Sequence, residues 1–291
     1  MVCSGQLSIC RGGWVGNLTR IYRRNIPMTE LSFPNLPFLE REKKPRETGI
    51  NYVRAPVLVG QCIDDYLLAY SDIIDIFKLS GKQAGQMSRS SLLKFLDTCK
   101  SNNVSISIGN PLMDMALNGG RKVVDDYLDR VVDYGVDIIE ISSIARSADD
   151  DDICRLIDVA SKRGLKVINE VGVAFAHSEV HDNMIFSERL GRQIQRFLDA
   201  GSWKILLESE GITENLEKDK FRWQLIDRLL SPLALSQFMV EADDQDVLSK
   251  YIEIYGPNIN MMVDYTRVLK MEDARTGHGP SQSLWGKVVK Y

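Results

Sequence analysis

Ionisable side chains follow several short apolar stretches of this chain, each near the point where the stretch ends. They are Arg54, Lys78, Glu140, Glu170, Glu208, Glu241 and Asp264. A single glutamate after a strand can simply cap the next helix, because its carboxylate accepts hydrogen bonds from free backbone N–H groups. Four glutamates in equivalent positions favour a ligand site instead, since like charges crowded together need a metal ion or cationic partners to stay ionised.

The apolar stretches recur about every thirty residues, the size of a βα unit, and a helix-like segment follows each. We expect strands at Asn51–Arg54, Ile73–Lys78, Val104–Ile108, Val136–Ile141, Leu165–Glu170, Trp203–Glu208, Gln237–Glu241 and Ile259–Val263. This pattern predicts an α/β fold, a single-domain (βα)8 TIM barrel, in which active sites form at the carboxyl ends of the strands. The ionisable side chains should therefore meet at one mouth of the barrel.

Helix boundaries are also readable between the strands. Ser88 precedes a leucine stripe at helical spacing, which predicts an N-cap, and the acidic run Asp149–Asp152 suits the positive end of a helix dipole. Gly164, Gly201 and Gly256 each close a helix-like segment, as expected of helix C-terminal caps.

Composition narrows the class of protein. The chain has 291 residues, 44% of them hydrophobic, which suits one domain with a sizeable core. A formal net charge of −4, with no helix face rich in lysine and arginine, argues against nucleic-acid binding. No apolar run approaches the length that spans a bilayer. The five cysteines lack CxxC spacing, so we expect neither a disulfide framework nor a zinc site. The protein is therefore expected in a reducing compartment.

The ends of the chain differ from its middle. Residues 1–29 contain several arginines and no acidic residue, which indicates an organellar transit peptide, an unstructured tail, or sequence upstream of a start at Met28. We expect a tail at 1–43, the barrel at 44–277 and a second tail at 278–291. The predicted location is the cytoplasm, or a mitochondrion or plastid if the leader is a transit peptide.

Other catalytic motifs are weak. His177 and His181 lie four residues apart but do not form the HExxH pattern of zinc proteases, and their segment has the composition of an exposed loop. The sequence contains neither a GxSxG nucleophile turn nor a glycine-rich phosphate-binding loop.

A series of short motifs runs in order from about Lys44 to Arg275. They are Lys44-Pro45-Arg46-Glu47-Thr48-Gly49, Asp75-Ile76-Phe77-Lys78, Ile139-Glu140-Ile141-Ser142, Asn169-Glu170-Val171-Gly172, Glu241-Ala242, Gly256-Pro257-Asn258-Ile259-Asn260 and Met271-Glu272-Asp273-Ala274-Arg275. Together they resemble the phosphosulfolactate synthase family. Val53-Arg54-Ala55-Pro56, Lys78-Leu79-Ser80-Gly81 and Tyr255–Asp264 are similar to its eukaryotic branch, which includes a plant heat-stress-associated protein.

The resemblance implies a (βα)8 barrel that adds sulfite to phosphoenolpyruvate with the help of Mg²⁺. Attack of sulfite on the methylene carbon pushes charge into the substrate carboxylate and forms an enediolate-like species. A metal ion or cations must stabilise that charge, and an acid then protonates the neighbouring carbon. Carboxylates are suitable ligands for the metal.

The resemblance also implies roles for individual residues. Lys78, Glu140 and Glu170 are the expected catalytic residues, and Glu140 and Glu170 are the expected ligands of Mg²⁺. Substrate binding is expected from Arg46, Lys82, Glu208, Glu241, Asn258, Asn260 and Arg275. We expect a small anionic metabolite as the ligand and leave a homo-oligomer open.

The chain departs from the family pattern at several motifs. Where the family continues Glu-Val-Gly with lysine, a candidate proton donor, this chain has Val173 and Ala174. Other departures are Leu79-Ser80-Gly81-Lys82, Ile108-Gly109-Asn110 and Ser209-Glu210. Two functions therefore stay open: a lyase-like enzyme in which Lys78 or Lys82 transfers the proton, or a stress-associated protein that contacts a chaperone or client.

Overall fold

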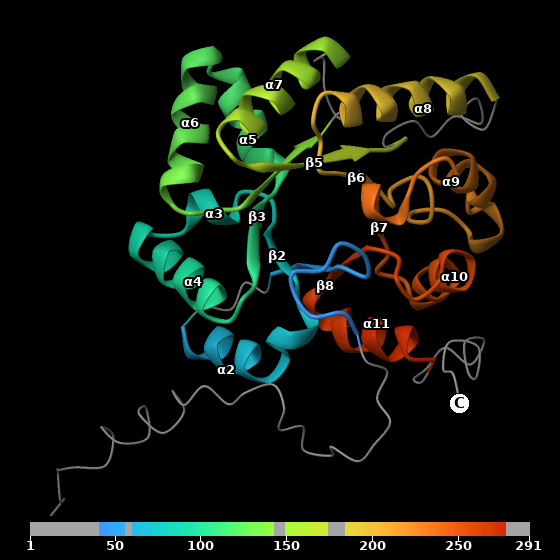
Figure 1. Cartoon of the computed structure of the whole chain (residues 1–291), viewed down its shortest axis with the longest axis horizontal. Coiled ribbons are helices and arrows are strands. Elements are labelled where there is room, and N and C mark those ends of the chain that lie inside the picture. The colour runs from blue at the N-terminus through green and yellow to red at the C-terminus, as the bar shows by residue number, and fades with distance from the viewer. Residues whose placement is uncertain (1–40, 56–59, 143–148, 174–183, 278–291) are drawn as a thin grey trace, which may run out of the picture. The chain divides into compact units, whose positions relative to one another are not determined.

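The computed structural model describes residues 41–55, 60–142, 149–173 and 184–277, and in them the strands close into one parallel barrel (Figure 1). The strands are β1 (Asn51–Arg54), β2 (Ile76–Leu79), β3 (Ser105–Ile108), β4 (Ile138–Ser142), β5 (Lys166–Val171), β6 (Lys204–Leu207), β7 (Phe238–Glu241) and β8 (Met261–Asp264). Each pairs with its neighbours along the chain, and β1 pairs with β8. The predicted (βα)8 TIM barrel is confirmed.

Strand β2 starts later than the apolar pattern predicts. Ser71–Ile73 forms a turn of 3₁₀ helix, in which Ile74 N–H donates to Ser71 O at 3.1 Å. Ile74 follows this turn with extended backbone and is buried, so the buried, extended chain begins two residues before the first strand pairing of β2 at Ile76.

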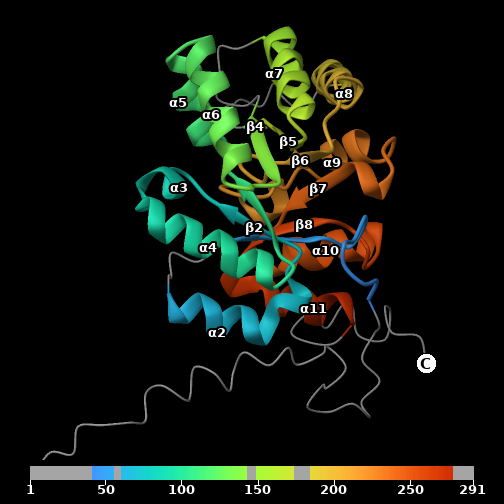
Figure 2. The same ribbon diagram turned by 60° about the vertical axis from the view of Figure 1, so that its left-hand side comes forward.

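Helices cover the outside of the barrel (Figures 1 and 2). They are α2 (Gln61–Tyr70), α3 (Gln83–Gln86), α4 (Arg89–Ser101), α5 (Asn110–Asn118), α6 (Arg121–Asp133), α7 (Asp150–Lys162), α8 (Met184–Asp199), α9 (Trp223–Leu230), α10 (Gln245–Tyr255) and α11 (Val268–Arg275). No helix in the described ranges is long and apolar enough to cross a membrane.

The predicted caps are present. Ser88 Oγ accepts a hydrogen bond from Ser91 N–H at 3.2 Å at the start of α4, and Asp149 accepts one from Asp152 N–H at 2.8 Å at the start of α7. Gly164, Gly201 and Gly256 all have positive φ, at 83°, 106° and 85°. Glycine adopts this conformation without the steric penalty that a Cβ brings.

The core has two parts. The larger lies between the strands and the surrounding helices. The smaller fills the barrel interior and consists of Ile50, Tyr52, Ile76, Ile138, Ile168, Leu206, Met239 and Met262, with Trp203 against it. Because side chains alternate between the two faces of a strand, residues two positions further along these strands also point inward, toward the carboxyl-terminal mouth. The smaller part of the core, called the apolar plug below, separates this mouth from the amino-terminal end of the barrel.

Cys62, Cys99 and Cys154 are free thiols, while Cys3 and Cys10 lie outside the described residues. His177 and His181 also lie outside them. The predicted domain boundaries stay predictions.

Candidate active site at the carboxyl-terminal mouth

Five of the predicted site residues meet at the carboxyl-terminal mouth of the barrel. Lys78, Glu140, Glu170 and Glu241 are buried inward residues of β2, β4, β5 and β7, and Glu208 follows β6. Lys78 forms an ion pair with Glu140, with 2.8 Å between Nζ and Oε2. Glu208 is hydrogen-bonded to both Glu170 and Glu241. The alternation of the strands therefore gathers one cation and four carboxyl groups above the apolar plug.

The Lys78–Glu140 pair is part of a buried hydrogen-bonded chain. Tyr52 OH donates to Glu140 Oε1 at 2.5 Å, and Ser107 Oγ lies 2.8 Å from the same phenol oxygen. Burial lowers the pKa of Lys78, but Glu140 and Glu170 raise it more, so the pKa of this ammonium lies above its usual value. Lys78 is therefore a permanent positive charge in the mouth.

Glu208 is the carboxyl group whose protonation differs most from that of an ordinary glutamate. Burial, together with the neighbouring Glu170 and Glu241, raises the pKa of Glu208 to about 11. Burial also tends to raise the pKa of Glu241, but its ion pair with Arg54 outweighs this and lowers the pKa. Glu208 thus holds a proton at neutral pH, while Glu241 is ionised.

Two further contacts shape the mouth. Asn110, the first residue of α5, donates to Glu170 Oε2 at 3.0 Å. Gly109 lies directly over the ion pair: a Cβ at this position would be 3.3 Å from Lys78 Cε and 3.5 Å from Glu140 Oε2. The departure from the family motif at Ile108-Gly109-Asn110 therefore falls on residues that contact the site.

The position of the missing family lysine is closed. Val173 is only 4% exposed, and a Cβ built on Gly211 would meet Val173 Cγ2 at 3.3 Å. Gly211 itself has φ of 67° in the segment after β6. Valine fits beneath this segment, whereas a lysine would have to bury its ammonium there. Ala174 lies outside the described residues.

Three of the predicted substrate-binding residues lie at the opposite, amino-terminal end of the barrel. Arg46 forms an ion pair with Asp75, which precedes β2, at 2.8 Å. Asn260, which precedes β8, accepts a hydrogen bond from Ile50 N–H at 2.9 Å and donates to Phe238 O at 2.9 Å. Arg275 donates to Asn51 Oδ1 at 3.1 Å, so these side chains tie the amino ends of the strands together.

Asn51 also links this network to the ion pair of Arg46 and Asp75. Its backbone N–H donates to Asp75 Oδ2 at 2.8 Å, and its side chain donates to Glu272 Oε2 at 3.0 Å. Burial of Arg275 lowers its pKa to about 9, with Arg41 contributing. All of these groups have protein partners, and none is brought to the mouth that contains Lys78.

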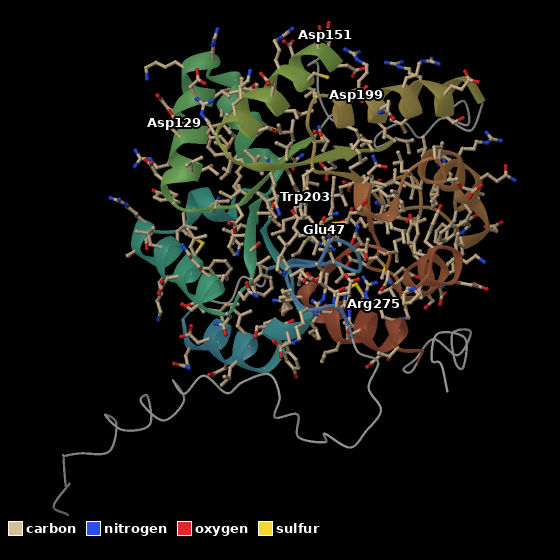
Figure 3. All side chains as sticks on the ribbon, viewed as in Figure 1. Glu47, Asp129, Asp151, Asp199, Trp203 and Arg275 are labelled. Carbon is tan, nitrogen blue, oxygen red and sulfur yellow. The ribbon has the colours of Figure 1, made fainter. Side chains whose placement is uncertain are left out.

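The same end contains a buried lysine that the sequence analysis did not single out. Lys204 donates to Ser236 O at 2.6 Å and to Glu47 O at 3.1 Å, and its Nζ lies 4.6 Å from the centre of the Trp203 ring. Figure 3 labels Glu47 and Trp203. Lys166 Nζ lies 4.4 Å from the same ring. Burial lowers the pKa of Lys204 to about 8, and its hydrogen bonds to two backbone carbonyls give it a structural role.

The remaining predicted residues are exposed. Lys82 precedes α3 at the surface, and Asn258 uses its backbone oxygen to accept a hydrogen bond from Gly49 N–H at 2.6 Å. Neither makes a contact with the glutamates of the mouth that the structure records.

The two predicted magnesium ligands, Glu140 and Glu170, have different surroundings. Both oxygens of Glu140 are engaged, one by Lys78 and one by Tyr52, and the side chain is 0% exposed. Mg²⁺ prefers near-octahedral oxygen ligands at 2.0–2.1 Å and usually keeps several waters. In the described residues, no group of three or more histidine, cysteine, aspartate or glutamate side chains is placed to hold a metal ion. Glu140 therefore does not fit the metal role, whereas Glu170 keeps the carboxylate chemistry of a ligand.

Sequence reasoning missed three residues that shape the site. Tyr52 counts as a hydrophobic residue, and the sequence analysis included it in an apolar stretch. It lies two positions before Arg54 and so shares the inward face of β1. Ser107 has the same inward position on β3, and Asn110 follows Gly109 at the start of α5. The period-two alternation of a strand was the available signal for Tyr52 and Ser107.

Comparison with known proteins shows which family of sequences this chain matches. The sequence model of (2R)-phospho-3-sulfolactate synthase (ComA) matches residues 39–279. The chain is similar to the protein HEAT-STRESS-ASSOCIATED 32 of Arabidopsis thaliana, with 23% identity over 82% of this chain and 90% of the relative. It is also similar to the phosphosulfolactate synthase of Methanothermobacter thermautotrophicus, with 24% identity over 76% of this chain and 85% of the relative.

Solved structures show the same barrel fold. The carboxyl transferase domain of Rhizobium etli pyruvate carboxylase matches with a TM-score of 0.55 and 8% identity, over 77% of this chain and 41% of that one. A putative phosphonomutase from Burkholderia cenocepacia matches with a TM-score of 0.51 and 11% identity, over 78% of this chain and 93% of that one. At such low identity these matches establish the fold alone.

Proposed function

Because the chain belongs to the (2R)-phospho-3-sulfolactate synthase family, whose sequence model spans residues 39–279, we propose that its mouth binds a small carboxylate and adds sulfite to phosphoenolpyruvate. One observation carries the proposal: Lys78 is a buried ammonium at the carboxyl ends of the strands, surrounded by Glu140, Glu170 and Glu241. An anionic group of the substrate can take a charge-assisted hydrogen bond from this ammonium, in competition with the surrounding glutamates.

The reaction divides between the two halves of the mouth. Sulfite forms a carbon–sulfur bond to the methylene carbon of phosphoenolpyruvate, and the displaced π electrons move toward the substrate carboxylate. Lys78 stabilises that negative charge, as a preorganised cation does in a transition state. The adjacent carbon then takes the proton held by Glu208, and bisulfite restores this proton, so atoms and charges balance.

Glu208 supports this assignment because the lysine that the family resemblance makes a candidate proton donor is absent. Val173 occupies the position of the family lysine and is sealed beneath Gly211. A carboxyl group that keeps its proton at neutral pH, directly after the neighbouring strand β6, provides a replacement acid. No step uses magnesium, because Glu140 is occupied by Lys78 and Tyr52; magnesium dependence stays a prediction.

The burial of Val173, where the family has a lysine, also favours a second function. Val173 removes the lysine that the family uses, and the similar Arabidopsis protein has a name that refers to heat stress rather than to catalysis. The second proposal is a stress-associated protein that acts through contacts with a chaperone or client and has lost the family reaction.

One experiment separates the two functions. The protein is incubated with phosphoenolpyruvate, sulfite and Mg²⁺, and phosphosulfolactate is measured by mass spectrometry. The enzyme proposal expects product from the parent, none from the double variant Lys78→Met, Glu140→Gln, and parental amounts from Lys94→Met, which removes an exposed lysine on α4. Absence of product, together with no phosphoenolpyruvate-dependent rise in melting temperature, would reject the enzyme and favour the stress-associated function.

A further inference from the structure

The ion pair of Lys78 and Glu140 occupies the position that the family resemblance gives to a metal ion. We propose that Glu140 holds the Lys78 ammonium and not a divalent cation, so that Lys78 is the positive charge against which an anionic ligand binds. The ligand in this inference rests on the proposed function, whereas the assignment of Glu140 does not.

Each oxygen atom of Glu140 lies within about 3 Å of a polar atom of the protein. Nζ of Lys78 is 2.8 Å from Oε2, and the hydroxyl of Tyr52 is 2.5 Å from Oε1. Ser107 in turn lies 2.8 Å from the Tyr52 oxygen, so Glu140 is fixed from two sides. A hydrated divalent ion would have to displace the ammonium and the phenol from a side chain that is 0% exposed.

The space around the pair is also filled. Gly109 lies over it, and even a single added methyl group there would come within 3.3 Å of Lys78 Cε. Met262 Sδ lies 3.7 Å from Nζ on the other side. These contacts hold the ammonium of Lys78 between Glu140, Gly109 and Met262.

Lys78 keeps capacity to bind an anion. An ammonium has three N–H donors; Lys78 donates one to the thioether of Met262, a weak acceptor, and its Nζ forms an ion pair with Glu140. Arg54, the other cation of the mouth, is paired with both Glu241 and Asp243. A ligand carboxylate in the mouth is thus expected to take its charge-assisted hydrogen bond from Lys78.

The two assignments of Glu140 predict opposite effects of one substitution. If Glu140 were a metal ligand, Glu140→Gln would weaken Mg²⁺-dependent binding of phosphoenolpyruvate by at least about tenfold. If Glu140 holds Lys78, the substitution removes the anion that competes for the ammonium. Binding then stays equal or becomes tighter by up to about tenfold, and it is the same in EDTA as in Mg²⁺.

The test is calorimetric titration of the full chain with phosphoenolpyruvate, in EDTA and in Mg²⁺. Glu188→Gln, which removes an exposed carboxylate on α8, is the matched control and should bind as the parent does. The inference is overturned if Mg²⁺ strengthens binding by the parent at least tenfold and Glu140→Gln cancels that gain.

Removal of the lysine needs a second variant. Lys78→Met alone would leave Glu140 buried without its cation and could fail to fold. The double variant Lys78→Met, Glu140→Gln replaces the pair by neutral side chains of similar size. It should fold and bind phosphoenolpyruvate at least about tenfold more weakly than the parent. Parental affinity in this double variant would also overturn the inference.

A metal readout distinguishes failure of this inference from failure of the proposed function. Mn²⁺ bound to the parent and to Glu140→Gln is counted by electron paramagnetic resonance. Equal amounts in both, including none, support the inference even if phosphoenolpyruvate does not bind, in which case the proposed function alone fails. Mn²⁺ bound by the parent and lost in Glu140→Gln contradicts the inference.

Discussion

Replacement of Glu208 by glutamine tests whether this carboxyl group carries a proton in the folded protein. Glu208 is hydrogen-bonded to Glu170 and Glu241, and its pKa is raised to about 11 by burial and by these neighbours. A glutamine amide keeps an N–H donor for these neighbours in place of the single O–H of the protonated acid, and it has no proton to lose. The substitution therefore keeps the contacts and removes the titration.

The sign of the effect follows from proton linkage. In the unfolded chain a glutamate loses its proton at about pH 4.3. In the folded protein Glu208 keeps its proton until the pH approaches its raised pKa. Between these values the folded state binds one more proton than the unfolded state, so the free energy of unfolding falls as the pH rises. The stability contributed by the protonated carboxyl is complete below the unfolded pKa and is lost as the pH rises toward 11.

The size of the effect is limited because Glu208 changes the number of bound protons by at most one per molecule. From about pH 6 to about pH 8, the parent should lose about 2.7 kcal/mol of stability relative to Glu208→Gln, because one proton corresponds to about 1.4 kcal/mol per pH unit. Urea denaturation of both proteins at the two pH values measures this difference. Glu188→Gln, on the exposed face of α8, should keep the pH dependence of the parent.

The reasoning is refuted if the stability difference between parent and Glu208→Gln is the same at both pH values. A parent that gains stability relative to the variant at the higher pH would refute it more strongly, since Glu208 would then be ionised and favourably paired in the folded state.

Three further predictions follow from buried contacts. Val173→Lys should lower the free energy of unfolding by about 3–5 kcal/mol without raising product formation, because the ammonium would be buried beneath Gly211; a gain in phosphosulfolactate by mass spectrometry would contradict this. Asp75→Asn should cost about 3 kcal/mol through loss of the Arg46 pair, measured by urea denaturation, and calorimetry should show unchanged affinity at the opposite mouth. Leu206→Ala, in the apolar plug, should cost about 2–5 kcal/mol in the same denaturation assay, and a cost below 1 kcal/mol would mean that the plug collapses around the cavity.

The architecture was predictable because its determinants are local in sequence. Strand-length apolar runs, a cap at Ser88 and glycines such as Gly164 and Gly256 mark each βα unit without reference to distant residues. The period-two alternation of strands also fixes which side chains point into the barrel, so the gathering of Lys78 with the glutamates could be expected. The start of β2 was placed too early because Ile73, the last residue of the 3₁₀ turn, and the buried Ile74 continue the apolar pattern of the strand toward the amino terminus.

The partners of the site residues were decided by the tertiary structure. Motif order indicates which residues a family shares, but not which end of the barrel each side chain reaches or which partners it finds there. Arg46, Asn260 and Arg275 belong to motifs of the family, yet they lie below the apolar plug, where they join the amino ends of the strands.

The sequence by itself determined a barrel with carboxyl groups and a lysine at one mouth, because strand alternation and chain order suffice to place them there. Only the closed barrel brought Glu140 of β4 across to Lys78 of β2 and Tyr52 of β1. These contacts join residues that are far apart in the chain, and their distances depend on how eight strands close around a particular set of interior side chains. For that reason the sequence could predict a charged site, while the assignment of Glu140 to an ammonium required the fold.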